Sequence, residues 1–338
     1  MRRFSPGRWN LMTDSVQILG ISNAIVDVLA HIDDATLEDI GSVPGSMNLV
    51  DQARANEIYN AIGPATEMSG GSVANTIAGF ANLGGKTAYI GKVHDDQFGR
   101  IFNHDMKSLG VDVRLPRAQA GAPTARSLVL ITKDGQRTMH TYLGACTELG
   151  LADITNSTVG EPRIMLLEGY VWDIAEGPSL ARKAIDIARS NGTAVALSLS
   201  DSFCVERHQS SFMQFVGDGV DIVVADEDEA NALFETDSFD DTLAALDGFT
   251  NLWAITRSEK GSVIVHGNEK IEYPATPVEK VVDTTGAGDA YCAGFLFGWA
   301  NGHPLAECAR YGTYCATRVI QQLGARIEPG LLDDFESP

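Results

Sequence analysis

Between about residues 160 and 321, short apolar runs alternate with longer segments of helical pattern. Neighbouring parallel strands need a crossover of about a dozen residues, usually a helix, so this alternation predicts a parallel, doubly wound α/β sheet with helices on both faces. The expected strands are 163–167, 194–199, 221–224, 252–256 and 278–282, and the expected helices are 177–190, 205–215, 227–234, 286–300 and 305–321, with a hairpin over 261–273. Such sheets bind ligands at the carboxyl ends of their strands, so functional residues should lie in the loops that follow.

The first half of the chain predicts a second, smaller sheet. The segments 125–132 and 137–142 flank Lys133-Asp134-Gly135, and a short turn of this kind between two apolar runs is typical of a β-hairpin. With 26–32 and 47–50, these segments predict a small sheet drawn from about 26–50 and 111–145, within a single domain over 16–335. The other elements expected here are strands at 16–21 and 87–90, a helix at 51–62, and a helix between the pairs Gly70-Gly71 and Gly84-Gly85.

The composition argues against several classes of protein. The chain carries 25 Lys and Arg against 45 Asp and Glu, a net charge of −20, so a basic face for nucleic acid is not expected. No apolar run reaches the roughly 18–20 residues that span a bilayer, so no membrane segment is expected either. Five scattered cysteines without a CxxC pair indicate reduced thiols in a cytoplasmic protein. Residues 1–15 lack the apolar core of a secretory signal and are expected to be a disordered extension.

The most informative loop lies between a predicted strand and a predicted helix. A β-branched run ends at Asp283, a tight turn follows over 284–288, and a helix of small and apolar residues starts at Asp289. Glycines let the backbone approach a ligand closely, and the free N–H groups and positive end of the helix dipole favour a phosphate. A carboxylate in that first turn would lie beside the phosphoryl group, where a general base is needed. An ordinary helix start with an acidic first turn is the alternative interpretation of this turn taken alone.

Two competing nucleotide-binding motifs are absent from the expected places. A dinucleotide-binding G-x-G-x-x-G/A fingerprint starting at Gly286 needs a small residue at position 291, where Tyr291 stands. A G-x-x-x-x-G-K-[ST] phosphate loop ending in Gly85-Lys86-Thr87 needs a glycine at position 80, where Phe80 stands. A nicotinamide-dependent oxidoreductase and a Walker-type NTPase therefore lose their main support.

Two motifs resemble one enzyme family. DTTGAGDAYCAG, at 283–294, resembles the C-terminal signature of the ribokinase (PfkB) family of carbohydrate and nucleoside kinases. The segment 70–113, which begins GGSVANTIAGF, is similar to the N-terminal signature of the same family. The resemblance extends from about residue 16 to about residue 330. It implies a ribokinase-like αβα domain with a small β-sheet lid over the substrate, and a kinase that uses ATP and Mg²⁺.

The resemblance implies a role for each residue of the phosphate loop. Asp289 falls on the family's catalytic base, and Gly286, Ala287 and Gly288 fall on the anion hole that stabilises charge on the transferring phosphoryl group.

Three further residues match positions near this loop. Asp283 and Thr285 match positions that in many members help to bind a monovalent cation, so K⁺ is a further expected cofactor. Arg137 matches a lid arginine that many members direct toward substrate or phosphate. A solvated hairpin charge is an equally open interpretation of Arg137.

At the substrate end, the resemblance points to a set of polar residues and glycines from two segments, namely Asn23, Asp27, Gly70, Gly71 and Asn75. An amide and a carboxylate are a common means of binding vicinal hydroxyls, and the glycine pair allows a polyol to approach closely. Without the resemblance, turn and helix capping would be the favoured explanation of these residues.

Two segments resemble adenosine kinases in particular, namely ISNAIVDVL at 21–29 and LSLSDSF at 197–203. A purine needs a stacking partner, and Tyr170, Trp172 and Phe203 are the candidate rings, each of which also suits an ordinary core position.

The resemblance places the ATP side at two further loops. Family members usually carry Asn-x-x-Glu after a central strand to support a network of Mg²⁺, water and phosphate; here Glu229 matches, but Asp226 replaces the asparagine. The acidic run also suits a helix start that complements the dipole. Thr256 and Gly261 match the nucleotide-side turn, in which Arg257 either meets phosphate or faces solvent.

These residues predict an ATP-dependent kinase acting on a primary, 5′-type hydroxyl of a nucleoside, with adenosine to AMP as the leading reaction. The alternatives are a kinase for a free sugar such as ribose or fructose, and a non-catalytic ligand-binding relative. The expected partner is a small molecule, and the expected assembly is a monomer or a homodimer.

Overall fold

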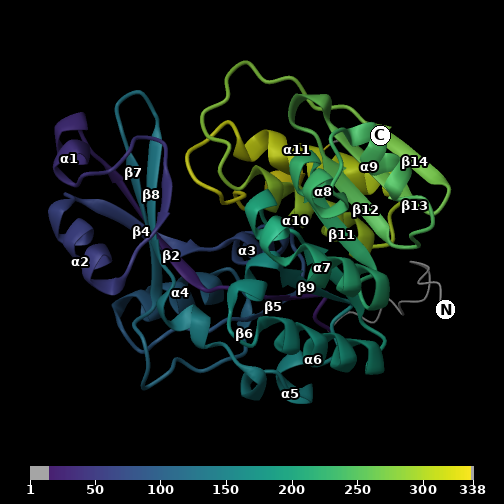
Figure 1. Cartoon of the computed structure of the whole chain (residues 1–338), viewed down its shortest axis with the longest axis horizontal. Helices are drawn as coiled ribbons and strands as arrows, with labels where there is room; N and C mark the ends of the chain where they lie inside the picture. Colours follow the sequence, from purple (N-terminus) through teal and green to yellow (C-terminus); the bar gives the residue numbers. More distant parts are fainter. Residues whose placement is uncertain (1–14, 336–338) are drawn as a thin grey trace.

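The computed structural model describes residues 15–335, which form two β-sheets with helices around them (Figure 1). The large sheet has the strand order β14-β13-β12-β11-β10-β9-β1-β5-β6. Its strands are β1 Ile18–Ile21, β5 Thr87–Ile90, β6 Asp112–Val113, β9 Ile164–Glu168, β10 Ala194–Ser198, β11 Ile222–Asp226, β12 Leu252–Thr256, β13 Ser262–His266 and β14 Glu269–Tyr273. Strands β6 to β12 run parallel, and the hairpin β13–β14 adds an antiparallel edge. The predicted doubly wound sheet is confirmed.

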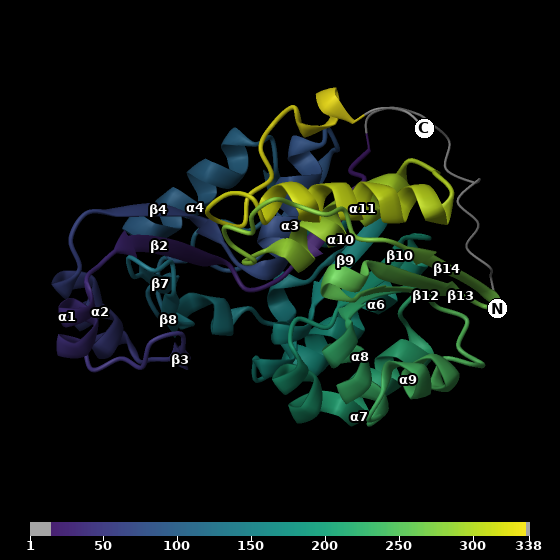
Figure 2. The ribbon, with the colours of Figure 1, turned by 90° about the horizontal axis from the view of Figure 1, so that it is seen from above.

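The two faces of this sheet carry separate hydrophobic layers. In β9, Leu166 packs with α3 and α10 on one face, whereas Met165 and Leu167 pack with α6 and α7 on the other. Figure 2 shows α3, α10 and α11 on one side of the sheet and α6 to α9 on the opposite side. The helices are α1 Asp34–Asp39, α2 Gln52–Ala61, α3 Ser72–Asn82, α4 Gln97–Ser108, α5 Asn156–Val159, α6 Gly177–Ser190, α7 Ser202–Asp218, α8 Glu227–Phe234, α9 Phe239–Ala245, α10 Ala287–Ala300 and α11 Leu305–Val319. Parallel strands buried on both faces explain the continuous apolar runs in the sequence.

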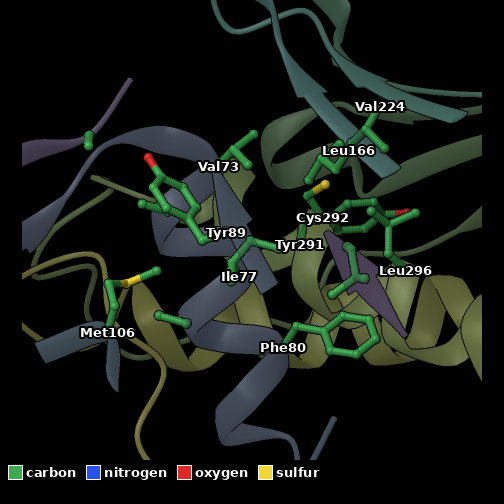
Figure 3. Close-up of a cluster of buried hydrophobic side chains, with 14 of the residues drawn as sticks. Val73, Ile77, Phe80, Tyr89, Met106, Leu166, Val224, Tyr291, Cys292 and Leu296 are labelled. Atoms are coloured by element: carbon green, nitrogen blue, oxygen red, sulfur yellow. The ribbon is translucent and has the colours of Figure 1, made fainter. Parts of the chain in front are cut away.

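Helices α3 and α10 are held together by the core that underlies the loop 283–289. Ile77 and Phe80 of α3 and Tyr291 and Leu296 of α10 belong to one buried cluster with Leu166 (Figure 3). This packing brings together the two family-like motifs, which lie about 200 residues apart in the chain.

The small sheet has five strands in the order β3-β8-β7-β2-β4 and lies at one end of the molecule (Figure 1). Its strands are β2 Ile25–His31, β3 Met47–Leu49, β4 Ala65–Gly70, β7 Ala125–Ile131 and β8 Arg137–Tyr142. All four strands expected for this sheet are therefore found in it. The fifth strand, β4, was missed because ATEMSG is short, polar and half exposed, with no apolar run to mark it. The small sheet was also expected to draw on the chain from about residue 111. The strand found there, β6, pairs instead with β5 in the large sheet.

The predicted strand at 278–282 is wrong, because this segment has no regular structure. Val281 and Val282 are 50% and 43% exposed, and the N–H groups of Val282 and Asp283 both donate to Ile320 O, at 2.8 and 3.2 Å. The β-branched run therefore lies against the end of α11, while the hairpin β13–β14 occupies the edge of the sheet.

Some expectations concern the ends and the surface of the chain. Apart from Ser15, the expected extension over 1–15 lies outside the described residues. Between residues 15 and 335, no helix combines the length and apolar character needed to cross a membrane. The five cysteines all lie in this part of the chain, and each is buried and outside any disulfide.

Candidate active site

Asp289 lies in the first turn of α10 and is held by side chains from α3. Ser72 Oγ donates to Asp289 Oδ1 at 2.7 Å, and Asn75 Nδ2 donates to Oδ2 at 3.0 Å. Thr76 Oγ1 donates to the backbone carbonyl of Asp289 at 3.2 Å. Burial raises the pKa of Asp289, and the hydrogen bonds from Ser72 and Asn75 and the charge of Arg326 oppose this rise. The carboxylate is thus fixed in orientation and is more basic than an exposed aspartate.

The backbone ahead of Asp289 presents free N–H groups. Gly286 caps α10 in the left-handed region, with φ of 75°. The N–H of Ala287 donates to Thr284 O, and that of Ala290 is the first to donate within the helix, to Gly286 O. The N–H groups of Gly288 and Asp289 have no partner among residues 15–335, so they are free for a bound anion.

The two glycines of this loop differ in what surrounds them, and they predict different outcomes. A Cβ on Gly288 would meet no atom within 4 Å, so Gly288→Ala should keep the melting temperature while its methyl group obstructs the approach of a phosphate. Losing one anion-hole donor typically costs about 10²–10³ in kcat.

A Cβ on Gly286 would lie 2.3 Å from Ala325 Cβ at a positive φ, so Gly286→Ala should lower stability by about 1–3 kcal/mol. Thermal melts and ATP-dependent rates of both variants check this; a fully active Gly288→Ala enzyme would show that no phosphoryl group contacts the loop.

Arg137 reaches the phosphate loop from the start of β8. Its Nη1 donates to Thr285 Oγ1 at 2.7 Å, and its Nη2 forms an ion pair with Asp283 Oδ2. Asp283 also accepts the N–H of Thr285 at 3.0 Å and the N–H of Gly324 at 2.8 Å. The two residues expected as cation ligands are therefore engaged with the lid arginine and with backbone N–H groups.

On the substrate side, Asp27 lies on β2, opposite Met68 of β4. A Cβ on Gly70 would lie 2.2 Å from Asp27 Oδ2, so only glycine leaves room for this carboxylate. Burial raises the pKa of Asp27 to about 6; the charges of Arg326 and Arg137 oppose the rise, and that of Asp289 adds to it. The carboxylate thus lies within the same electrostatic environment as Asp289.

Asn23 and Gly71 lie next to each other on the substrate side. Asn23 is 3% exposed, and its Oδ1 is buried with no hydrogen-bond partner among the described residues. Gly71 has φ of 96°, and a Cβ there would lie 2.6 Å from Asn23 O. Buried polar atoms are nearly always bonded, so the free Oδ1 of Asn23 needs an external donor such as a substrate hydroxyl. Asn75, which was expected at the substrate, donates instead to Asp289.

Sequence reasoning missed Arg326, whose charge acts on both Asp27 and Asp289. Its Nη1 donates to Ala74 O at 2.9 Å, and its Nη2 donates to the backbone O of Ser69 and, at 2.9 Å, to Ser69 Oγ. Its positive charge lowers the pKa of both Asp27 and Asp289. No pattern in the segment around Arg326 signals this role, because the contacts join positions more than 250 residues apart.

Sequence reasoning also missed Glu168, at the end of β9. This side chain is 1% exposed, and its Oε2 accepts the N–H of Val73 at 3.0 Å, at the start of α3. Burial raises the pKa of Glu168 to about 7; the hydrogen bond from Val73 opposes the rise, and the charge of Asp289 adds to it. A glutamate at the end of a fully apolar strand was the signal that would have found it.

The acidic pair expected on the ATP side forms a reciprocal helix cap. Asp226 Oδ1 accepts the N–H of Glu229 at 2.7 Å, and Glu229 Oε2 accepts the N–H of Asp226 at 2.9 Å. Burial and the charge of Asp226 raise the pKa of Glu229 to about 8, and the charges of Asp201 and Asp289 act in the same direction. The acidic run therefore begins a helix, with Asp226 exposed at its cap and Glu229 buried beside it, and the role of the pair on the ATP side stays a prediction.

The nucleotide-side turn lies beside this pair. Thr256 is the register partner of Asp226 across β11 and β12. Gly261 has φ of 88°, and a Cβ there would lie 2.0 Å from Tyr273 O, so the turn requires glycine. Arg257 is partly buried and pairs with Glu227 at 2.7 Å, so its guanidinium is not free in solvent, and a contact with phosphate stays a prediction.

The three candidate rings lie in different environments. Trp172 is 2% exposed, packs against Phe212 with ring centroids 4.8 Å apart, and donates from Nε1 to Ser211 Oγ at 2.9 Å, so it is a core residue. Tyr170 is partly buried. Phe203 is 70% exposed in the first turn of α7 and is the candidate of the three that is free to contact a ligand.

Known proteins and solved structures resemble this chain over most of its length. The family described as pfkB family carbohydrate kinase matches residues 40–330. The crystal structure of adenosine kinase from Sinorhizobium meliloti is 47% identical, with a TM-score of 0.87, over 95% of this chain and 98% of that one. A protein described as a probable sugar kinase from Rhizobium etli is 42% identical, with a TM-score of 0.87, over 94% of this chain and 97% of that one. A 5-dehydro-2-deoxygluconokinase from Geobacillus thermodenitrificans is 26% identical over 83% of this chain and 88% of its own length.

Proposed function

The chain belongs to the pfkB family of carbohydrate kinases, and we propose that it transfers the γ-phosphate of ATP to the 5′-hydroxyl of adenosine, giving AMP. Its ribokinase-like fold and its family make it a phosphotransferase with an alcohol acceptor. The observation that carries adenosine as the acceptor is the 47% identity to an adenosine kinase across almost the whole of both chains. Its buried cysteines, outside any disulfide, support a reducing, cytoplasmic setting.

In the proposed mechanism, Asp289 takes the proton from the acceptor hydroxyl as the oxygen attacks the γ-phosphorus of ATP, and the bond from that phosphorus to the bridging oxygen breaks so that ADP leaves. The hydrogen bonds from Ser72 and Asn75 hold the carboxylate in one orientation. The N–H groups of Gly288 and Asp289, at the positive end of α10, stabilise charge on the transferring phosphoryl group. Asp27 and the free Oδ1 of Asn23 bind the hydroxyls of the ribose.

Members of this family use ATP with a divalent metal, and the residues on the ATP side suit Mg²⁺. Glu229 is a buried carboxylate whose neighbours Asp226 and Asp201 raise its pKa, so a hard cation would relieve their mutual repulsion. Bound there through water, Mg²⁺ would neutralise charge on the ATP phosphates. Thr256 and Gly261 would line the nucleotide beside it.

Asp226→Asn restores the usual residue of the family and tests what the extra carboxylate does. Asparagine caps helices as well as aspartate, so the melting temperature should stay the same. The variant should need more free Mg²⁺ for half-maximal rate, by about 1 kcal/mol or roughly fivefold, and should bind ATP no worse. Rates titrated against free Mg²⁺ at fixed MgATP check this. If the two titrations superimpose, Asp226 is a helix cap alone.

Acceptor affinity should depend on pH through Asp27. Because its pKa is raised to about 6, this carboxylate is ionised above that pH and takes up a proton below it. A protonated acid accepts hydroxyl hydrogen bonds less well, so KM for the acceptor should rise several-fold between pH 7.5 and pH 5. Asp27→Asn, which cannot titrate, should show a flatter dependence of KM on pH. An identical slope in the variant would assign the pH dependence to another group.

A free sugar is the second candidate acceptor, because specific relatives favour it. The Rhizobium etli protein is described as a probable sugar kinase, and the Geobacillus thermodenitrificans relative phosphorylates a sugar acid derivative according to its name. The residues that bind hydroxyls are compatible with either acceptor, since a nucleoside presents the same ribose diol.

A direct assay decides between the two acceptors. Formation of ADP from ATP is measured with adenosine, guanosine, inosine, cytidine, ribose, fructose and 5-dehydro-2-deoxygluconate under the same conditions. We expect adenosine to have the highest kcat/KM, by at least tenfold. A higher value for any free sugar would overturn the proposal, and Asp289→Asn serves as the blank for contaminating kinases.

A further inference from the structure

The phosphate loop already contains a positive charge supplied by the lid. Asp283 is 6% exposed, and its Oδ1 accepts the N–H of Thr285 at 3.0 Å. Its Oδ2 accepts the N–H of Gly324 at 2.8 Å and pairs with the guanidinium of Arg137. Thr285 Oγ1, in turn, accepts Nη1 of Arg137 at 2.7 Å. The side-chain oxygens of both expected cation ligands are thus engaged by N–H donors.

These residues do not fit a monovalent cation while Arg137 is in place. A K⁺ or Na⁺ ion bound to Asp283 Oδ2 and Thr285 Oγ1 would lie beside a guanidinium that contacts the same two oxygens. Like charges at that separation repel strongly when they are partly shielded from water, and the side chain of Arg137 is only 13% exposed. The ion would also have to give up water for oxygens that already have donors.

The guanidinium is well suited to replace such an ion. It is always charged, it is weakly hydrated, and its planar donors can contact a carboxylate and a hydroxyl at once. The neighbouring positive charge balances the negative charge of Asp283 next to the loop that receives the phosphoryl group. A monovalent cation bound at this position would balance the charge of Asp283 in the same way.

The lid delivers this charge because of its hairpin. Arg137 is the first residue of β8, opposite Ile131 of β7, directly after the turn that contains Gly135 with φ of 84°. Thr132 Oγ1 donates to Asp134 Oδ1 at 2.5 Å, which braces the turn. The contact from Arg137 to Thr285 spans 148 residues of sequence and joins the two sheets.

We propose that the guanidinium of Arg137 replaces the monovalent cation at the phosphate loop, so that this kinase works without K⁺ or Na⁺. Charge balance at Asp283 then depends on the lid being in contact with the loop. The proposal rests on the kinase activity of the chain, and it holds for whichever acceptor the enzyme uses.

The test compares rates in KCl, NaCl and choline chloride at equal ionic strength, with ATP supplied as its Tris salt. The wild-type rate should differ by less than twofold among the three salts. Arg137→Gln should be at least tenfold slower in choline chloride and should recover at least fivefold in KCl, since the vacated oxygens can then bind the ion. Arg137→Lys, which keeps the charge, should remain less dependent on K⁺ than Arg137→Gln.

A matched control comes from the same turn. Lys133 is exposed and has no contact with the phosphate loop, so Lys133→Gln removes a lid charge without touching Asp283. This variant should behave as the wild type in all three salts. A wild-type enzyme activated more than tenfold by K⁺, or an Arg137→Gln enzyme as indifferent to K⁺ as the wild type, would overturn the proposal.

A second readout needs no acceptor and no turnover. The melting temperature of Arg137→Gln should be higher in KCl than in choline chloride by a few degrees, whereas that of the wild type should be equal in the two salts. Equal melting temperatures for Arg137→Gln in the two salts would count against ion binding at Asp283. If adenosine proves not to be the acceptor, the melts and the rates with the true acceptor still decide the role of Arg137.

Discussion

Asp289→Asn is expected to abolish most turnover while leaving the fold intact. The side chain keeps its size and still faces Ser72 and Asn75 of α3, but it can no longer take the proton of the acceptor hydroxyl. Loss of a general base typically costs about 10²–10⁴ in kcat. The measurement is kcat for ADP formation at saturating ATP and acceptor, together with ATP affinity by calorimetry, which should change little.

Ser72→Ala provides the graded comparison. This substitution removes the 2.7 Å hydrogen bond to Asp289 Oδ1 and leaves the base in place. It should cost less than Asp289→Asn, because the bond from Asn75 still orients the carboxylate. The thermal melt of each variant separates lost chemistry from lost folding. An Asp289→Asn enzyme within tenfold of the wild type would remove Asp289 from the role of base.

Asp27→Ala is expected to raise KM for the acceptor about 10²-fold with almost no change in KM for ATP. The carboxylate lies on β2 of the lid, and it is the acidic group of that strand placed to accept hydrogen bonds from hydroxyls of the acceptor. A hydrogen bond to a charged group contributes about 1.5–3 kcal/mol, so losing one strong bond or two weak ones produces an effect of this size. Initial rates with each substrate varied in turn give both KM values.

Gly70 offers a check on Asp27 that leaves the carboxylate present. A Cβ on Gly70 would lie 2.2 Å from Asp27 Oδ2, so Gly70→Ala should displace this carboxylate and raise KM for the acceptor in the same direction. If Asp27→Ala changed KM for ATP alone, the two ends of the site would be the reverse of those proposed here.

Local patterns of apolar and polar residues predicted most of the secondary structure. They failed where apolar residues are exposed or where polar residues form a strand. The alternation after residue 160 predicted the parallel strands because strands buried on both faces form continuous apolar runs, as the first four residues of β9, Ile164 to Leu167, do. The same reasoning was wrong at 278–282. Val281 and Val282 are β-branched, but their side chains are exposed, and the backbone of Val282 bonds to Ile320 at the end of α11. This reasoning also missed β4, whose polar residues become a strand because β2 offers a full row of partners.

The sequence by itself determined the phosphate loop. The glycine turn and the helix start are both local, so the free N–H groups near Gly288 and the placement of Asp289 in the first turn follow from neighbouring residues, even though the strand predicted before the turn is absent. The sequence also predicted that Gly70 and Gly286 lie where the backbone approaches a ligand closely. Only the fold shows that atoms of Asp27 and Ala325 leave no room for a side chain at these two positions.

Only the tertiary structure decided how the charges around that loop are arranged. The charge of Arg326 lowers the pKa of Asp289, and Glu168 accepts the N–H of Val73. Arg137 forms an ion pair with Asp283. The partners in these three interactions are 37 to 146 residues apart in the chain. Hydrogen bonds and Coulomb interactions depend on distance in space, and no local pattern specifies which distant groups the packing of α3, α10 and the lid will bring within a few ångströms. The raised pKa of Asp289 and the guanidinium beside Asp283 are therefore properties of the fold, whereas the loop they serve is a property of the sequence.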